Sequence, residues 1–345
     1  MGFPSSIAIL VLLLIGPIAV HWIERNIDLY IVVLGIVATL LGRGFDLPLV
    51  ERALGEPVAI TIAVIAAGIL FGFMRDPLDR LFSLVRRRID PPVLAALSVF
   101  IVGALSSLIT AIVAAVVLVE VTALLRLANR RRRKFVVAGC FAIGLGSALT
   151  PLGGPLSTLA ASALDLPFLG LFTLLAPWVI PGIAASAIIA GFFARSDDDS
   201  APAQAQLEES PLAAIMQGAR IYAFIAGLVL VSHAYAPLAG RFVPMLSADA
   251  LFWMNTTSAL LDNATLVAIE FHPMAVARAR EAILALLISG GMLIPGNIPN
   301  IVTAGALRIG SGAWARVGAP MGLAMLGIYF ALLKLAAWWA GAPLK

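Results

Sequence analysis

Charged residues are scarce in this sequence. Asp, Glu, Lys and Arg make up only 12% of its 345 residues, whereas 61% are hydrophobic; an ordinary soluble domain has about 25% charged residues. A soluble core could not enclose so many apolar side chains. Since a spanning helix needs about 20 apolar residues, the uncharged stretches predict an all-α, multi-pass membrane protein with about eight transmembrane helices and two shorter insertions.

Cysteine is almost absent as well. Cys140 is the only one, which excludes a disulfide and a cysteine metal site. The sequence contains no Gly-Lys-Ser or Gly-Lys-Thr loop, so ATP is not expected to be the energy source within this chain. We expect no cofactor and no enzymatic reaction. By elimination, transport would be coupled to an ion gradient.

The basic residues are clustered. Eleven of the 23 Lys and Arg residues lie in Arg75–Arg88 and Arg126–Lys134, which predicts two cytoplasmic loops of a cell inner membrane protein. Membrane lipids with anionic headgroups, and not nucleic acid, are the expected partner of these loops. Residues 76–88 also have the spacing of an amphipathic surface helix. Ser5–Ile23 has no Lys or Arg before it and no small-residue cleavage site after it, so we expect a retained helix.

Residues 91–125 form an apolar stretch whose only charge is Glu120. A straight helix of this length would reach about 52 Å, whereas the hydrocarbon core is roughly 30 Å thick. Both flanking loops are rich in arginine and should share the cytoplasmic side. We therefore expect a re-entrant hairpin that turns near Ser106–Thr110, where polar groups are tolerable only inside protein or beside a wet cavity.

The next apolar region, residues 135–194, has room for two crossings. The first of these, residues 135–164, should be a broken helix, because closely spaced prolines and glycines interrupt the helical hydrogen bonds. The interrupting residues are Pro151, Gly153, Gly154 and Pro155. The polar segment 195–210 then reads as a cytoplasmic linker between two halves.

The second half repeats this plan, with a hairpin over 247–277 and a broken helix over 281–307. Ser106 and Ser258 are 152 residues apart, and Pro151 and Pro295 are 144 apart. Three crossings per half is an odd number, so the second half should be inverted, as in transporters built from inverted repeats with discontinuous helices. The expected segments are residues 1–56 (N-terminal transmembrane helices), 57–194 (repeat 1), 195–210 (linker) and 211–345 (repeat 2). The residues expected to break the second helix are Pro295, Gly296 and Pro299.

Asp262 is the most informative single residue. It lies among apolar neighbours at the tip of the second hairpin, and a carboxylate at the bilayer centre costs roughly 2.5 to 3.5 kcal/mol. A bound cation such as Na+ would compensate this cost, because hard cations bind oxygen ligands. The alternative is a structural aspartate that binds the backbone of its own turn.

Amide and hydroxyl side chains near the hairpin tips and helix breaks are the expected further ligands of the cation or proton. They are Asn263, Thr265, Asn297, Asn300, Ser107, Thr110 and Thr150. Each has a structural alternative: a proline break can be a packing kink, and membrane hydroxyls commonly bond their own backbone. Glu120 and Glu270, in the exit arms of the hairpins, are candidate proton relays or simply solvated carboxylates.

Two segments carry a family resemblance. Leu261–Leu266 and Ile294–Asn300 resemble signatures of the DUF1646 family of predicted cation transporters, within the ion transporter superfamily of sodium/proton antiporters, arsenite pumps and dicarboxylate carriers. The resemblance extends from about Pro57 onward. The Asp-Asn pair is similar to that of NhaD-type antiporters, which implies that Asp262 and Asn263 bind a cation. Dicarboxylate carriers have Ser-Asn-Thr at both tips, and this chain departs from that pattern.

The expected function is therefore exchange of a monovalent cation, Na+, for protons by alternating access. A sodium-coupled symporter of a small organic anion, such as a dicarboxylate, is the alternative. The resemblance also implies a homodimer, since dimers are common in the superfamily.

Overall fold

The computed structural model describes residues 3–20, 22–23, 26–42, 44–58, 61–62, 65–66, 89–195, 211–260, 263–270 and 275–339. Three of the expectations above fall outside this part: the amphipathic helix 76–88, nearly all of the linker 195–210, and Asp262. Thr265 lies in a described helix, but its side chain is outside the description. Within the described residues, all regular elements are helices.

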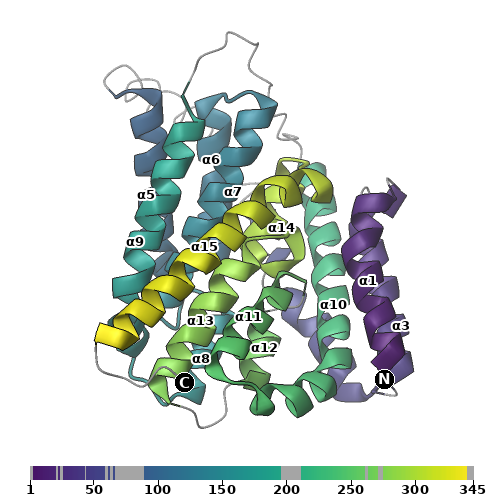
Figure 1. Cartoon of the computed structure of the whole chain (residues 1–345). Coiled ribbons are helices and arrows are strands. Elements are labelled where there is room, and N and C mark those ends of the chain that lie inside the picture. Colours follow the sequence, from purple (N-terminus) through teal and green to yellow (C-terminus); the bar gives the residue numbers. More distant parts are fainter. Residues whose placement is uncertain are drawn as a thin grey trace.

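These helices make an all-α membrane protein (Figure 1). Among the described residues, four segments are long and apolar enough to cross a bilayer: Pro91–Ile109, Gly170–Phe193, Gly218–Phe242 and Ser311–Trp339. The α-helices are α1 (Phe3–Ala19), α3 (Ile27–Gly42), α5 (Pro91–Ile109), α6 (Ala111–Leu125), α7 (Asn129–Gly146), α8 (Pro155–Ala163), α9 (Gly170–Phe193), α10 (Pro211–Phe242), α11 (Ala248–Met254), α12 (Asn263–Glu270), α13 (Val276–Gly290), α14 (Ile298–Ala306) and α15 (Ser311–Trp339). The short 3-10 helices are η1 (Ser147–Leu149), η2 (Val243–Met245), η3 (Asn255–Ala259) and η4 (Ile294–Gly296).

Helix α3 packs closely along α10. A Cβ atom added to Gly35 would lie 2.7 Å from the carbonyl oxygen of Gly227, and one added to Gly227 would lie 2.6 Å from the backbone nitrogen of Val32. The hydroxyl of Thr39 also donates to the carbonyl of Leu230 across this contact, at 3.2 Å. Small residues that let backbones approach are typical of helix crossings in membranes.

The long apolar stretch 91–125 is divided into two helices by one residue. Thr110 has a φ of 71° and joins α5 to α6. The two helices pack against each other, so the chain reverses direction there and forms a helical hairpin. Thr110 is the last residue of Ser106–Thr110, the interval in which the sequence predicts the turn.

The two halves share local backbone features, in which the hairpin serines are 152 residues apart and the corresponding residues of the broken helices are 143 residues apart. The hydroxyl of Ser106 donates to the carbonyl of Ile143, and that of Ser258 donates to the carbonyl of Leu286. Asp165, after α8, has a φ of 49°, and Arg308, after α14, has a φ of 51°. This correspondence reaches beyond the proline and serine matches seen in the sequence, because it includes residues of different type.

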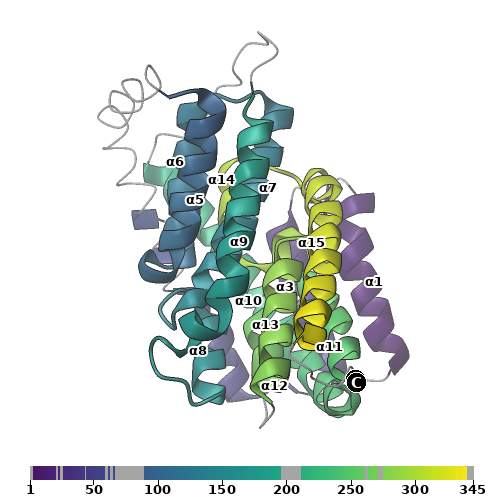
Figure 2. The same ribbon diagram turned by 60° about the vertical axis from the view of Figure 1, so that its left-hand side comes forward.

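Corresponding helices run in opposite directions. Figure 1 shows α7 starting at the end of the molecule where α5 begins, and α13 starting at the other end. The contacts are exchanged between the halves: α14 packs against α6, and α8 packs against α12. Both views place α8 and α12 at the lower end of the molecule, with α6 and α14 above them (Figure 1 and Figure 2).

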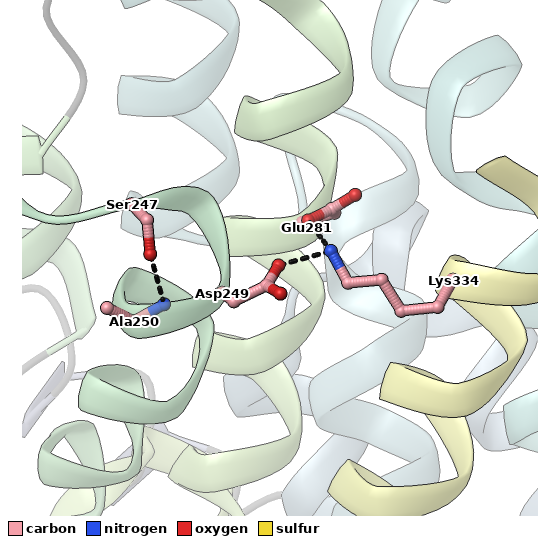
Figure 3. Close-up of polar contacts among 5 residues, drawn as sticks. All are labelled: Ser247, Asp249, Ala250, Glu281 and Lys334. Atoms are coloured by element: carbon pink, nitrogen blue, oxygen red, sulfur yellow. Dashed lines mark hydrogen bonds and ion pairs between the residues drawn. The ribbon is translucent and has the colours of Figure 1, made fainter. Parts of the chain in front are cut away.

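Lys334 connects three elements at the lower end of α15. Figure 3 shows its side chain reaching between Asp249 of α11 and Glu281 of α13. The ammonium group contacts Asp249 Oδ1 and lies 3.9 Å from Glu281 Oε2. This cation, in the apolar C-terminal part of α15, is therefore matched by two carboxylates and fixes α11 and α13 against α15.

Candidate cation-binding site

The first helix break is bonded to the tip of the first hairpin. Helix α7 ends at Gly146 and α8 begins at Pro155, within the interval where the sequence predicts an interruption. The buried hydroxyl of Thr150 donates to the carbonyl of Ser107 at 2.6 Å. The amide of Ala111 donates to the carbonyl of Gly153 at 2.9 Å. The break and the hairpin therefore satisfy each other's backbone groups.

The second break has the same arrangement but is braced by amide side chains. Helix α13 ends at Gly290 and α14 begins at Ile298. Asn300 is fully buried, and its Nδ2 donates to the carbonyls of Gly290 at 2.7 Å and Leu293 at 2.8 Å. Both carbonyls belong to the end of α13 and the break that follows it. Asn300 therefore holds the unwound segment in a fixed shape.

Asn263, the first residue of α12, meets the second break at Gly290. A Cβ atom added to Gly290 would lie 2.5 Å from Asn263 Nδ2 and 2.9 Å from the carbonyl oxygen of Gly296. Only a glycine leaves room here for the amide of the hairpin and for the returning chain. Asn263 and Asn300 therefore converge on the same residue from two different elements.

Two amide oxygens at this point have no partner. Asn263 Oδ1 and Asn300 Oδ1 are buried atoms that accept no hydrogen bond within the described structure. Buried polar atoms in proteins are nearly always paired, and leaving one unpaired costs about 1 to 3 kcal/mol. These two oxygens belong to side chains whose amide nitrogens both meet Gly290, and amide oxygens are suitable ligands for a hard cation.

The two helix breaks lie next to each other. A Cβ atom added to Gly144, in the last turn of α7, would lie 2.8 Å from Asn297 Nδ2 and 3.8 Å from the carbonyl oxygen of Leu287. Asn297 stands at the start of α14 and makes no capping hydrogen bond with its side chain. Its amide is thus directed at the first half of the molecule and is free to take part in a site between the breaks.

The hydroxyl groups of the first half are mostly engaged with backbone. Thr150 donates to Ser107, as described, and also accepts from the amide of Leu152 at 3.3 Å. Thr110 accepts from the amide of Val113 at 3.5 Å, and Ser107 Oγ lies 3.4 Å from the carbonyl of Ala104. These contacts follow the structural alternative for membrane hydroxyls. The buried amide oxygens without a partner lie in the second half.

The two glutamates differ in their surroundings. Glu120 lies midway along α6 and is partly exposed. Glu270, the last residue of α12, is 3% exposed and is bonded to Asn255, which is fully buried. Sequence reasoning did not single out Asn255, because nothing local shows that residues 255 and 270 meet. It also did not single out Gly144, whose only signal is the absence of a side chain.

A groove between α9 and α15 is a separate feature. It has a volume of about 600 Å³, and its lining includes Trp178, Tyr329 and Trp339 but none of the predicted site residues. The hydroxyl of Tyr329 donates to the carbonyl of Trp178 at 2.7 Å. The groove offers no carboxylate or amide ligand, so the candidate cation site is at the helix breaks.

Comparison with known proteins supports one part of the resemblance found in the sequence, namely the family. A search of curated proteins finds no match. Residues 4–336 match the family described as "Protein of unknown function (DUF1646)". This match spans nearly the whole chain, and the chain is therefore a member of the DUF1646 family.

Proposed function

We propose that this protein is a secondary active transporter of the cell inner membrane that exchanges Na+ or another monovalent cation for protons. Its cation site would lie between the second hairpin and the two helix breaks. The observation that carries the proposal is the pair of unpartnered buried oxygens, Asn263 Oδ1 and Asn300 Oδ1. A cation bound between them would remove the cost of burying both without partners.

Asp262 supplies the charge in this proposal. It directly precedes Asn263, and a carboxylate in the bilayer interior requires a cation or a proton. Because one carboxylate binds either Na+ or H+, but not both, the two ions compete for it. That competition couples the two flows when the site opens to one side of the membrane at a time. Thr265, Asn297 and the hydroxyls of Ser107, Thr110 and Thr150 would complete the surroundings.

The proposed membrane arrangement follows from the same reasoning. The α5–α6 and α11–α12 segments would enter the bilayer from opposite faces as re-entrant hairpins, with about eight crossing helices around them. The arginine-rich loops would face the cytoplasm and its anionic lipids. The opposed directions of α7 and α13 support inverted repeats (Figure 1). The resemblance to the ion transporter superfamily supports the same function and a homodimer.

The test is sodium uptake into membrane vesicles driven by a pH gradient. Asp262→Asn should abolish this uptake, because the amide binds neither a proton nor Na+ as a carboxylate does. Asp90→Asn is the matched control, since Asp90 is an exposed residue before α5 that makes no capping bond. Uptake that is unchanged by Asp262→Asn would dismiss the mechanism.

One observation favours a second candidate, a sodium-coupled symporter of a small organic anion. A Cβ atom added to Gly154, just before α8, would meet no atom within 4 Å. Open space at a helix N-terminus can receive a carboxylate. Counterflow of labelled dicarboxylates would separate the two functions: it is expected of the symporter and not of the antiporter.

A further inference from the structure

Asn255 and Glu270 form a buried polar pair away from the helix breaks. Asn255 is the first residue of η3 and Glu270 is the last residue of α12. Asn255 Nδ2 donates to Glu270 Oε2 at 3.1 Å and lies 3.4 Å from the carbonyl oxygen of Ala282. Ala282 precedes Gly290 by eight residues, about 12 Å along α13. The pair is therefore distinct from the proposed cation site.

Each partner has a second oxygen without a hydrogen bond. Asn255 Oδ1 and Glu270 Oε1 are buried atoms that have no partner within the described structure. The residues themselves are 0% and 3% exposed. An ionised carboxylate with an empty, buried oxygen is costly. Asn255 Oδ1 likewise lacks a hydrogen-bond donor.

We infer that Glu270 holds a proton and that Glu270 and Asn255 form a neutral acid–amide pair, which makes a proton-binding site separate from Asp262. An acid and an amide that share one N–H···O bond can share a second bond in the opposite sense. The proton on Oε1 would be donated to Asn255 Oδ1. A single proton thereby gives both oxygens, Glu270 Oε1 and Asn255 Oδ1, a hydrogen-bond partner.

Within the described residues, the charged side chains on the surrounding elements form no ion pair with Glu270. Helix α12 packs against α8, α10, α13 and η2; α8 and η2 contain no charged residue, α10 carries Arg220, His233 and Arg241, and α13 carries Arg278, Arg280 and Glu281. Arg278 of α13 acts on Glu270 electrostatically. However, the guanidinium of Arg278 donates to the carbonyl of Leu246 at 2.9 Å. Among the described residues, no ion pair joins it to Glu270.

The role of this proton in transport rests on the proposed function. In an antiporter, a second proton site in the arm of the hairpin would release its proton only in a state in which water reaches Glu270. The carboxylic acid then becomes a carboxylate, and the proton passes to water. Whether Glu270 holds a proton in the resting protein can be measured without any transport assay.

The experiment is infrared spectroscopy of the purified, full-length protein at neutral pH. A protonated carboxylic acid has a carbonyl-stretch band that a carboxylate lacks. In an Asp262→Asn background, which removes the other carboxyl group proposed to bind a proton, this band should be present, lost when Glu270→Gln is added and unchanged when Glu281→Gln is added, since the carboxylate of Glu281 faces Lys334. Glu270→Gln should also melt at the wild-type temperature, because glutamine can exchange both hydrogen bonds with Asn255 as the protonated acid does.

Two results would overturn the inference. The band would be absent in the Asp262→Asn background, or it would persist there when Glu270→Gln is added. The proposed function is tested separately by the effect of Na+ on the melting temperature, since ligand binding stabilises the folded state. That effect should remain in Glu270→Gln. If Na+ did not raise the melting temperature of the wild type, the cation site would be refuted, whereas the inference of the acid–amide pair would be unaffected.

Discussion

Replacing Asn300 with alanine tests whether the second helix break depends on one amide. Its Nδ2 donates to the carbonyls of Gly290 and Leu293 at 2.7 and 2.8 Å, and the residue is fully buried. Alanine would leave two buried carbonyls without donors, at about 1 to 3 kcal/mol each. Part of this is offset, because the unpartnered Oδ1 of Asn300 is removed as well. We expect a net destabilisation of about 3 kcal/mol.

The assay is thermal or denaturant unfolding in detergent, first without Na+ and then across a sodium titration. Asn297→Ala is the matched control: Asn297 is partly exposed and makes no capping bond, so its loss should cost less than about 1 kcal/mol in sodium-free buffer. Under the proposed function, both variants should need about tenfold more Na+ for the same stabilisation, since a lost ligand worth about 1.4 kcal/mol lowers affinity tenfold. If Asn300→Ala were as stable as the wild type, the bracing role would be refuted. A sodium response that is unchanged in both variants would refute the ligand role.

Two further substitutions test the packing and the ion pairs of the fold. Gly227→Leu should destabilise the protein by about 1 to 3 kcal/mol or prevent folding, because α3 leaves no room for a side chain there; Gly240→Leu, on the same helix but with no atom within 4 Å, should unfold at the wild-type temperature. A Gly240→Leu variant that is equally destabilised would show that leucine, and not the crossing, is responsible. Lys334→Met should cost about 2 kcal/mol in chemical unfolding, because Glu281, only 13% exposed, loses its cation. Arg52→Met breaks the exposed Arg52–Glu56 pair and should cost less than about 0.5 kcal/mol; equal losses would mean that burial of Glu281 is unimportant.

Features that depend on local chemistry could be predicted from the sequence. Proline and glycine disrupt a helix wherever they occur in it, so the breaks at 147–154 and 291–297 were located from composition alone. The reversal at Thr110 followed from length, because 35 apolar residues exceed the bilayer thickness. Within the predicted N-terminal transmembrane region, α3 (Ile27–Gly42) has 16 residues and is short for a crossing.

Features that depend on distant residues could not be predicted. Cys140 was expected to have no disulfide or metal role, but nothing indicated that its sulfur would lie 3.2 Å from Thr303 Oγ1, where it joins α7 to α14. The pairing of Asn255 with Glu270 likewise depends on how η3 and α12 return to α13. Lys334 follows a long apolar run in the sequence, which does not show that its two acidic partners are contributed by α11 and α13.

The exchanged contacts between the halves limit how a cation site here could open. Helix α14, which follows the second break, packs against α6 of the first hairpin, and α8, which follows the first break, packs against α12 of the second hairpin. Each break also contacts the hairpin of its own half: Thr150 is hydrogen-bonded to Ser107 in the first, and Gly290 lies against Asn263 in the second. A hairpin that moved alone would therefore lose contacts in both halves. Packed elements that share contacts tend to shift as rigid bodies between discrete arrangements. Under the proposed function, the two hairpins and two broken helices should thus move as one unit against the α3–α10 pair, whose close crossing at Gly227 makes it a second rigid body.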